Sequence, residues 1–161
     1  MKQAMFFALF LLLTTTHHGL AAGGGGSDDN TASSSYSAAP KHPELKAARH
    51  AITRKQFTVA IDELRAVLDK QPEHADAWNL LGYSARKSGD FKTAEAAYTK
   101  ALEIDPKHTQ AMEYMGEMYL TLNQPEKAEQ LLNRLNKLCS FNCIDRDALK
   151  LAIKTYKAAQ S

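Results

Sequence analysis

A pattern of proline, glycine and alanine recurs along this chain with a period of about 34 residues, a length typical of stacked repeats. Pro72 and Pro106 are separated by one period, and so are Gly82 and Gly116. Three alanines follow the same spacing: Ala60, Ala94 and Ala128. A fixed period indicates an architecture that stacks copies of one supersecondary unit, because a single unit cannot bury its own apolar face.

Each unit reads as two helices joined by a tight turn. Apolar residues at spacings of three and four form one buried helical stripe in the central unit: Phe91, Ala94, Tyr98 and Ala101. Gly89 is suited to end the helix before this stripe, and Asp90 to cap the helix that carries it. The turn in the next unit ends in Pro125, whereas Lys55 stands at the equivalent place in the first unit without any glycine. We therefore predict units at about 41–74, 75–108 and 109–142, closed by a capping helix over 144–160.

Small residues at repeat-equivalent positions allow the two helices of a unit to approach closely. A leucine in place of Ala60, Ala94 or Ala128 would overpack that contact. We expect Gly82 and Gly116 to serve the same purpose on the partner helix of their own units.

The central unit resembles the tetratricopeptide repeat family through a set of small, aromatic and proline residues: Trp78, Leu81, Gly82, Gly89, Phe91, Ala94, Tyr98, Ala101 and Pro106. The resemblance implies an all-α fold, a right-handed α-solenoid of about three helix pairs plus the capping helix. It also implies a non-enzymatic module that binds a protein or peptide in its concave groove. From His108 onward the chain is similar to small exported proteobacterial members that end in a Cys-x-x-x-Cys segment and a final helix.

Residues 1–40 differ in composition from the repeats. Residues 1–22 combine a lysine, an apolar run of about ten residues and a small-residue exit, a pattern typical of a cleaved secretory signal peptide. Cleavage after Ala21 fits this pattern, cleavage after Ala22 fits it nearly as well, and the run is too short for a stable membrane span. Residues 23–40 are rich in glycine and serine and predict a disordered linker. We expect an exported protein, periplasmic or secreted.

The charge balance and the motifs exclude several functions. Lysine and arginine number 20 against 18 acidic residues. This near balance predicts no basic surface of the kind that binds nucleic acid. No phosphate-binding loop or nucleophile–base arrangement is present, so we predict neither an enzyme nor a cofactor.

The chain has two cysteines, Cys139 and Cys143. In an exported protein we expect them to form a structural disulfide between the third unit and the cap. The alternative is a thiol-redox protein, although the spacing is longer than Cys-x-x-Cys and no strands are evident. Zinc would need two further ligands, and no histidine lies nearby in the sequence.

Three histidines each follow a proline by two residues: His42, His74 and His108. We expect polar helix starts at these positions. Stacking is expected to keep them too far apart to share a metal ion, so no metal site is predicted.

The candidate partner-binding groove is lined by the first helix of each pair, which contributes Arg49, Asn79, Tyr83, Arg86, Glu113 and Glu117. Arg86 and Tyr83 are suited to hold a carboxylate and to stack on a peptide. Glu113 and Glu117 fall one turn apart and read as an exposed pair. The alternatives are a solvated face without a ligand, or a structural protein that associates with itself through its first helix. The sequence leaves the oligomeric state open.

Overall fold

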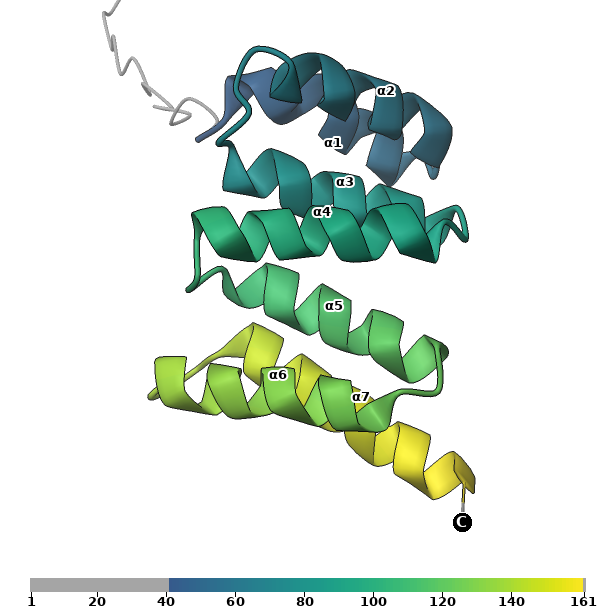
Figure 1. Cartoon of the computed structure of the whole chain (residues 1–161), viewed down its shortest axis with the longest axis vertical. Coiled ribbons are helices and arrows are strands. Elements are labelled where there is room, and N and C mark those ends of the chain that lie inside the picture. Colours follow the sequence, from purple (N-terminus) through teal and green to yellow (C-terminus); the bar gives the residue numbers. More distant parts are fainter. Residues whose placement is uncertain (1–40, 161) are drawn as a thin grey trace, which may run out of the picture. The chain divides into compact units, whose positions relative to one another are not determined.

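The computed structural model describes residues 41–160, and this part of the chain is helical throughout (Figure 1). A short 3-10 helix precedes seven α-helices in chain order: η1 Pro43–Leu45, α1 Lys46–Thr53, α2 Phe57–Leu68, α3 Ala75–Lys87, α4 Phe91–Ile104, α5 Thr109–Thr121, α6 Pro125–Leu138 and α7 Ile144–Gln160. The predicted all-α solenoid of three helix pairs and a cap is confirmed. The predictions for residues 1–40 fall outside the described residues.

The turn inside each helix pair has the same backbone conformation. Lys55, Gly89 and Asn123, at repeat-equivalent positions, take positive φ values of 58°, 84° and 58°. A left-handed residue at this place lets the chain reverse while the last carbonyls of the helix stay bonded. The residue after each of them donates its backbone N–H to a carbonyl five residues earlier, at 2.9, 2.9 and 2.8 Å. The first turn therefore forms like the others, with a lysine in the place of glycine.

The predicted small positions lie in the core. Ala60, Ala94 and Ala128 are fully buried. A Cβ atom on Gly82 would lie 2.7 Å from two ring carbons of Tyr98 in α4, which confirms close approach within that pair. The expectation for Gly116 is wrong in its partner, because a Cβ there would meet the side chain of Leu149 in α7 rather than α6.

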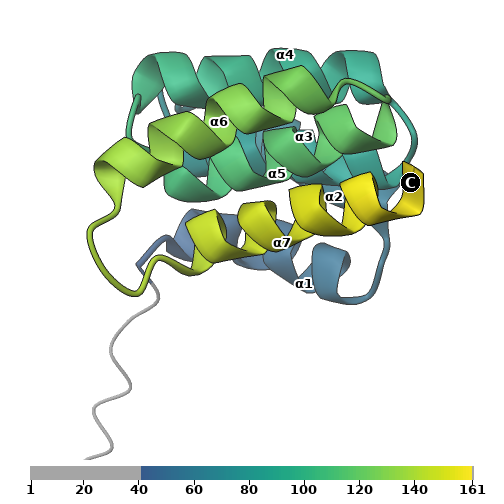
Figure 2. The same cartoon turned by 90° about the horizontal axis from the view of Figure 1, so that it is seen from below.

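Helix α7 closes the stack by packing against α5 and α6 (Figure 2). Leu149 and Ile153 join the main core cluster through the same face of this helix. The sulfur atoms of Cys139 and Cys143 are bonded across the connection from α6 to α7, with their Cα atoms 5.7 Å apart. The bridge fixes the start of the capping helix. Within residues 41–160, no helix is long and apolar enough to cross a membrane.

Candidate functional site

Two tyrosines and an arginine form a cluster on the first helices of the second and third pairs. Tyr83 and Arg86 come from α3, and Tyr114 comes from α5. The two tyrosine rings are 5.0 Å apart between centroids, and the guanidinium carbon of Arg86 lies 5.7 Å from each of them. Phe57 at the start of α2 meets Tyr83 edge-on at 6.3 Å. Such contacts between a cation and aromatic faces hold the guanidinium in one position.

Arg86 is paired within the protein. Its Nη1 atom lies 2.9 Å from Oε2 of Glu117, one helix away on α5. The arginine side chain is 10% exposed and the glutamate side chain 36%, so the pair sits at the border between core and solvent. The Nε–H of Arg86 is buried and has no hydrogen-bond partner within residues 41–160. The arginine therefore keeps one donor free while Glu117 neutralises its charge.

Glu113 is buried, with 5% of its surface exposed, so the expectation of an exposed glutamate pair is wrong. The third helix pair is followed by α7, which packs against α5 and places Asp145 near enough to Glu113 to act on its charge. Burial, and after it the neighbouring Glu117 carboxylate, raise the pKa of Glu113 to about 8, against the opposing effect of Arg86. At neutral pH the Glu113–Glu117 pair therefore holds a proton, and the cluster of Arg86, Glu113 and Glu117 is close to electrically neutral.

The remaining predicted groove residues lie apart from this cluster. Asn79 is buried rather than open to the groove, and its Nδ2 donates to Oε1 of Gln110 on α5 at 2.9 Å. This contact joins the second and third pairs. Arg49 is exposed on α1 and lines a separate hollow of about 260 Å³ that also includes Lys46 and His42. The structure thus brings together four of the six predicted residues, namely Tyr83, Arg86, Glu113 and Glu117.

A largely apolar hollow of about 620 Å³ adjoins the cluster between α5 and α7. Its walls combine the Arg86–Glu117 pair with residues from the end of α5 and the middle of α7: Leu120, Thr121, Ala148, Leu151, Ala152, Thr155 and Tyr156. Leu151 is 63% exposed there. The sequence prediction treated α7 only as a cap. The sequence feature that could have indicated this hollow is Leu151, a large apolar residue that lies beside the buried stripe of α7 and not within it.

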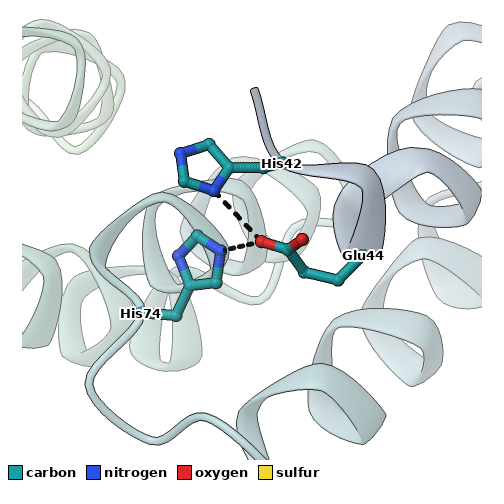
Figure 3. A group of neighbouring side chains, drawn as sticks. All are labelled: His42, Glu44 and His74. Atoms are coloured by element: carbon teal, nitrogen blue, oxygen red, sulfur yellow. Dashed lines mark hydrogen bonds and ion pairs between the residues drawn. The ribbon is translucent and has the colours of Figure 1, made fainter. Parts of the chain in front are cut away.

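The histidine prediction is half right. His108 caps α5, and its Nδ1 accepts from the backbone N–H of Ala111 at 3.2 Å. The expected separation is wrong for the first two histidines, because the rings of His42 and His74 are 4.8 Å apart between centroids. Figure 3 shows both side chains turned toward the carboxylate of Glu44. Both histidines are N-cap residues, His42 of η1 and His74 of α3, and these two helix starts lie side by side.

Comparison with known proteins identifies the repeats. Two family models described as tetratricopeptide repeat match residues 45–108 and 85–138, which together span more than half of the chain. The chain therefore belongs to the tetratricopeptide repeat family. Both matched models describe the repeat itself rather than a catalytic domain.

The curated relatives are similar over part of the chain. "Tetratricopeptide repeat protein 37" of Xenopus laevis is 35% identical over 94 residues, which cover 58% of this chain and 6% of that protein. "Uncharacterized protein ycf37" of Porphyra purpurea is 30% identical over 102 residues, covering 58% of this chain and 59% of that protein. The chain thus spans only a small part of the first of these relatives.

Solved structures share the fold at low identity. The Sgt2 tetratricopeptide domain from Aspergillus fumigatus has a TM-score of 0.60 at 22% identity, covering 76% of this chain and 80% of that one. The first tetratricopeptide domain of Spaghetti, solved bound to an HSP90 peptide, has a TM-score of 0.64 at 16% identity, covering 73% and 90%. MamA from Desulfovibrio magneticus RS-1 has a TM-score of 0.57 at 22% identity, covering 59% and 54%.

Proposed function

We propose that this protein is a non-enzymatic binding module that holds a segment of another protein on the face formed by α3, α5 and α7. The observation that carries the proposal is the apolar hollow beside the Arg86–Glu117 pair, with the exposed Leu151 on its wall. A concave, mostly apolar site with a few placed polar groups is the usual form of a ligand site. The peptide bound by the Spaghetti domain, which has the same fold, supports a peptide as the occupant here.

The walls of the hollow define the chemistry of its ligand. Leu120, Leu151 and Ala152 favour an aliphatic or aromatic side chain, which would bury apolar surface in the hollow. The guanidinium of Arg86, which lines the hollow, favours an acceptor, and a carboxylate there would compete with Glu117 for it. The proposed ligand is therefore a peptide with an apolar anchor next to an acidic or carbonyl oxygen. Preformed helices keep the cost of ordering the site low, and a surface this small favours micromolar affinity.

We further propose that the protein acts outside the cytoplasm as an adaptor or assembly factor. Two features support this: the signal-peptide pattern of residues 1–22, and the Cys139–Cys143 bridge, since disulfides persist in oxidising compartments. Fractionation of the source cells with N-terminal sequencing tests it. An extracytoplasmic protein that begins at Ala22 or Gly23 supports the proposal, whereas a cytoplasmic protein that retains Met1 contradicts it.

Peptides selected from a display library on the immobilised full chain provide the probe for the binding proposal. Their affinities are then measured by fluorescence anisotropy for the wild type and for Leu151→Asp. Because Leu151 is exposed, the substitution leaves the core intact, and the new charge in the apolar hollow is expected to weaken binding at least tenfold.

Ile144→Asp is the matched control, since Ile144 is an 83% exposed aliphatic residue of the same helix outside the hollow. It is expected to bind within twofold of the wild type. Equal loss in both variants, or no loss in Leu151→Asp, contradicts the proposed site. A selection that yields no peptide above background contradicts peptide binding itself.

A further inference from the structure

His42, Glu44 and His74 form a three-residue cluster at the N-terminal end of the repeats. The Oε1 atom of Glu44 lies 3.0 Å from Nδ1 of His42 and 2.7 Å from Nε2 of His74. One ligand atom from each residue lies within 4.8 Å of the others. In Figure 3 the two imidazoles approach the carboxylate from different elements, His42 and Glu44 from around η1 and His74 from the start of α3.

We propose that this cluster binds a divalent transition-metal ion, such as Zn²⁺, through His42 Nδ1, His74 Nε2 and the Glu44 carboxylate. Two imidazoles and a carboxylate form a donor set that zinc uses in proteins, with the fourth position left to water. Bonds of 2.0–2.2 Å in a tetrahedral site separate ligand atoms by about 3.3–3.5 Å. To admit an ion, the two Glu44 contacts of 3.0 and 2.7 Å therefore have to lengthen by about 0.3–0.8 Å. The two imidazole nitrogens, which lie within 4.8 Å of each other, have to come to the same spacing.

The surroundings of His42 match those of a metal ligand. Its other ring nitrogen, Nε2, lies 3.2 Å from Oδ2 of Asp76. A histidine that binds a metal nearly always donates its second ring N–H to a carboxylate or carbonyl, which fixes the tautomer and strengthens the ligand. Asp76 therefore positions His42 with Nδ1 facing Glu44 and His74.

The cluster is open to solvent. The side chains of His42 and Glu44 are 29% and 27% exposed, and they line an open hollow of about 560 Å³. An ion can thus reach the site from solvent.

The next pair of repeats supplies an internal comparison. His108 Nε2 lies 3.0 Å from Oδ1 of Asp76, in the same way that His74 Nε2 contacts Glu44. The stacking of the repeats alone therefore produces one histidine–carboxylate pair at each of these positions. His108 also uses Nδ1 to cap its own helix, and the metal-competent group of three among the described residues is the one with His42. The histidine before η1 is what turns a stacking contact into a chelating site.

Zinc titration of the metal-free full chain by isothermal calorimetry tests the proposal, with no affinity tag and with the disulfide confirmed by mass. The wild type is expected to bind one ion per chain, and His42→Asn, His74→Asn and Glu44→Gln each to weaken binding at least tenfold. Asparagine remains a good helix-capping residue, so the histidine variants keep their helix starts.

Three control variants are expected to bind within twofold of the wild type. His108→Asn removes the comparison pair, His50→Asn removes an exposed histidine of α1, and His17→Ala/His18→Ala removes the two histidines of the leader. Nitrogen-15 spectra of the imidazoles give a second readout, in which zinc is expected to shift Nδ1 of His42 and Nε2 of His74. The proposal is overturned if zinc does not bind, if the control variants lose binding equally, or if the spectra leave these two nitrogens unchanged.

Discussion

The buried Glu113 carboxyl makes a quantitative prediction about stability and pH. Its pKa is raised from an ordinary 4.5 to about 8, chiefly by burial. Between these two values the folded chain holds a proton that the unfolded chain releases, so the free energy of unfolding falls as pH rises through the window. Replacement by glutamine removes this effect, because the amide stays neutral at every pH.

The size of the effect follows from the width of the window. From pH 4.5 to pH 7, a proton held only by the folded chain lowers the free energy of unfolding by about 3.4 kcal/mol, at 1.36 kcal/mol per pH unit. Glu113 lies beside the solvent-facing Glu117 and shares its charge with that residue, so we discount the figure for screening to about 1–2 kcal/mol. Glu113→Gln is therefore expected to match the wild type near pH 4, to be about 1–2 kcal/mol more stable at pH 7 and to gain nothing further above pH 8.

Urea unfolding at pH 4, 5.5, 7 and 8.5 measures this difference. Trp78 is the only tryptophan, and its indole N–H donates to the Pro72 carbonyl at 2.7 Å, so its fluorescence reports unfolding. Glu63→Gln makes the same change at an exposed site on α2 and is the matched control. The reasoning is refuted if Glu113→Gln is no more stable than the wild type at pH 7, or if its advantage is the same at pH 4.

Three further predictions concern the turns, the helix contacts and the bridge. Gly89→Ala is expected to lower the free energy of unfolding in urea by about 1 kcal/mol, because the φ of Gly89 is 84°. Lys55→Gly at the equivalent turn is expected to raise it by up to about 1 kcal/mol. A change of the same sign in both variants contradicts the turn assignment. Gly82→Ala is expected to lose about 1–2 kcal/mol, because overpacking against the buried ring of Tyr98 exceeds the gain in helix propensity, and a stabilised variant contradicts the contact. Cys143→Ser is expected to lower the free energy of unfolding by at most about 2 kcal/mol, which is the loop-entropy value for so short a loop. It is expected to leave peptide affinity unchanged. A variant that is fully stable but has lost function favours thiol chemistry instead.

The sequence was sufficient for the features that depend on repetition. The repeat period located the helix pairs, and the small residues at Ala60, Ala94 and Ala128 proved to be buried as expected. The left-handed turns at Gly89 and Asn123 follow from local chemistry, since glycine and asparagine accept positive φ. Lys55 takes the same conformation because the repeat imposes it, against the local preference of lysine.

The sequence was insufficient where one repeat meets an element that is not a repeat. Glu113 resembles an exposed helix residue by spacing, and its burial depends on the elements packed around α5. The hollow around Leu151 arises from the same junction. At the other end, the starts of η1 and α3 bring His42 and His74 together, so the repeat spacing overestimated the distance between them. Both ends of the solenoid therefore hold the features that periodicity could not predict.

The most direct test of the proposed function is to map a selected peptide on the nitrogen-15-labelled full chain by NMR. Backbone amides around Glu117 and Leu151 are expected to shift in a saturable manner, because the ligand occupies the hollow between α5 and α7. Amides around Thr99 in α4 and Lys127 in α6, which line a different hollow, are expected to stay in place. Saturable shifts confined to α4 and α6 would contradict binding in the hollow between α5 and α7.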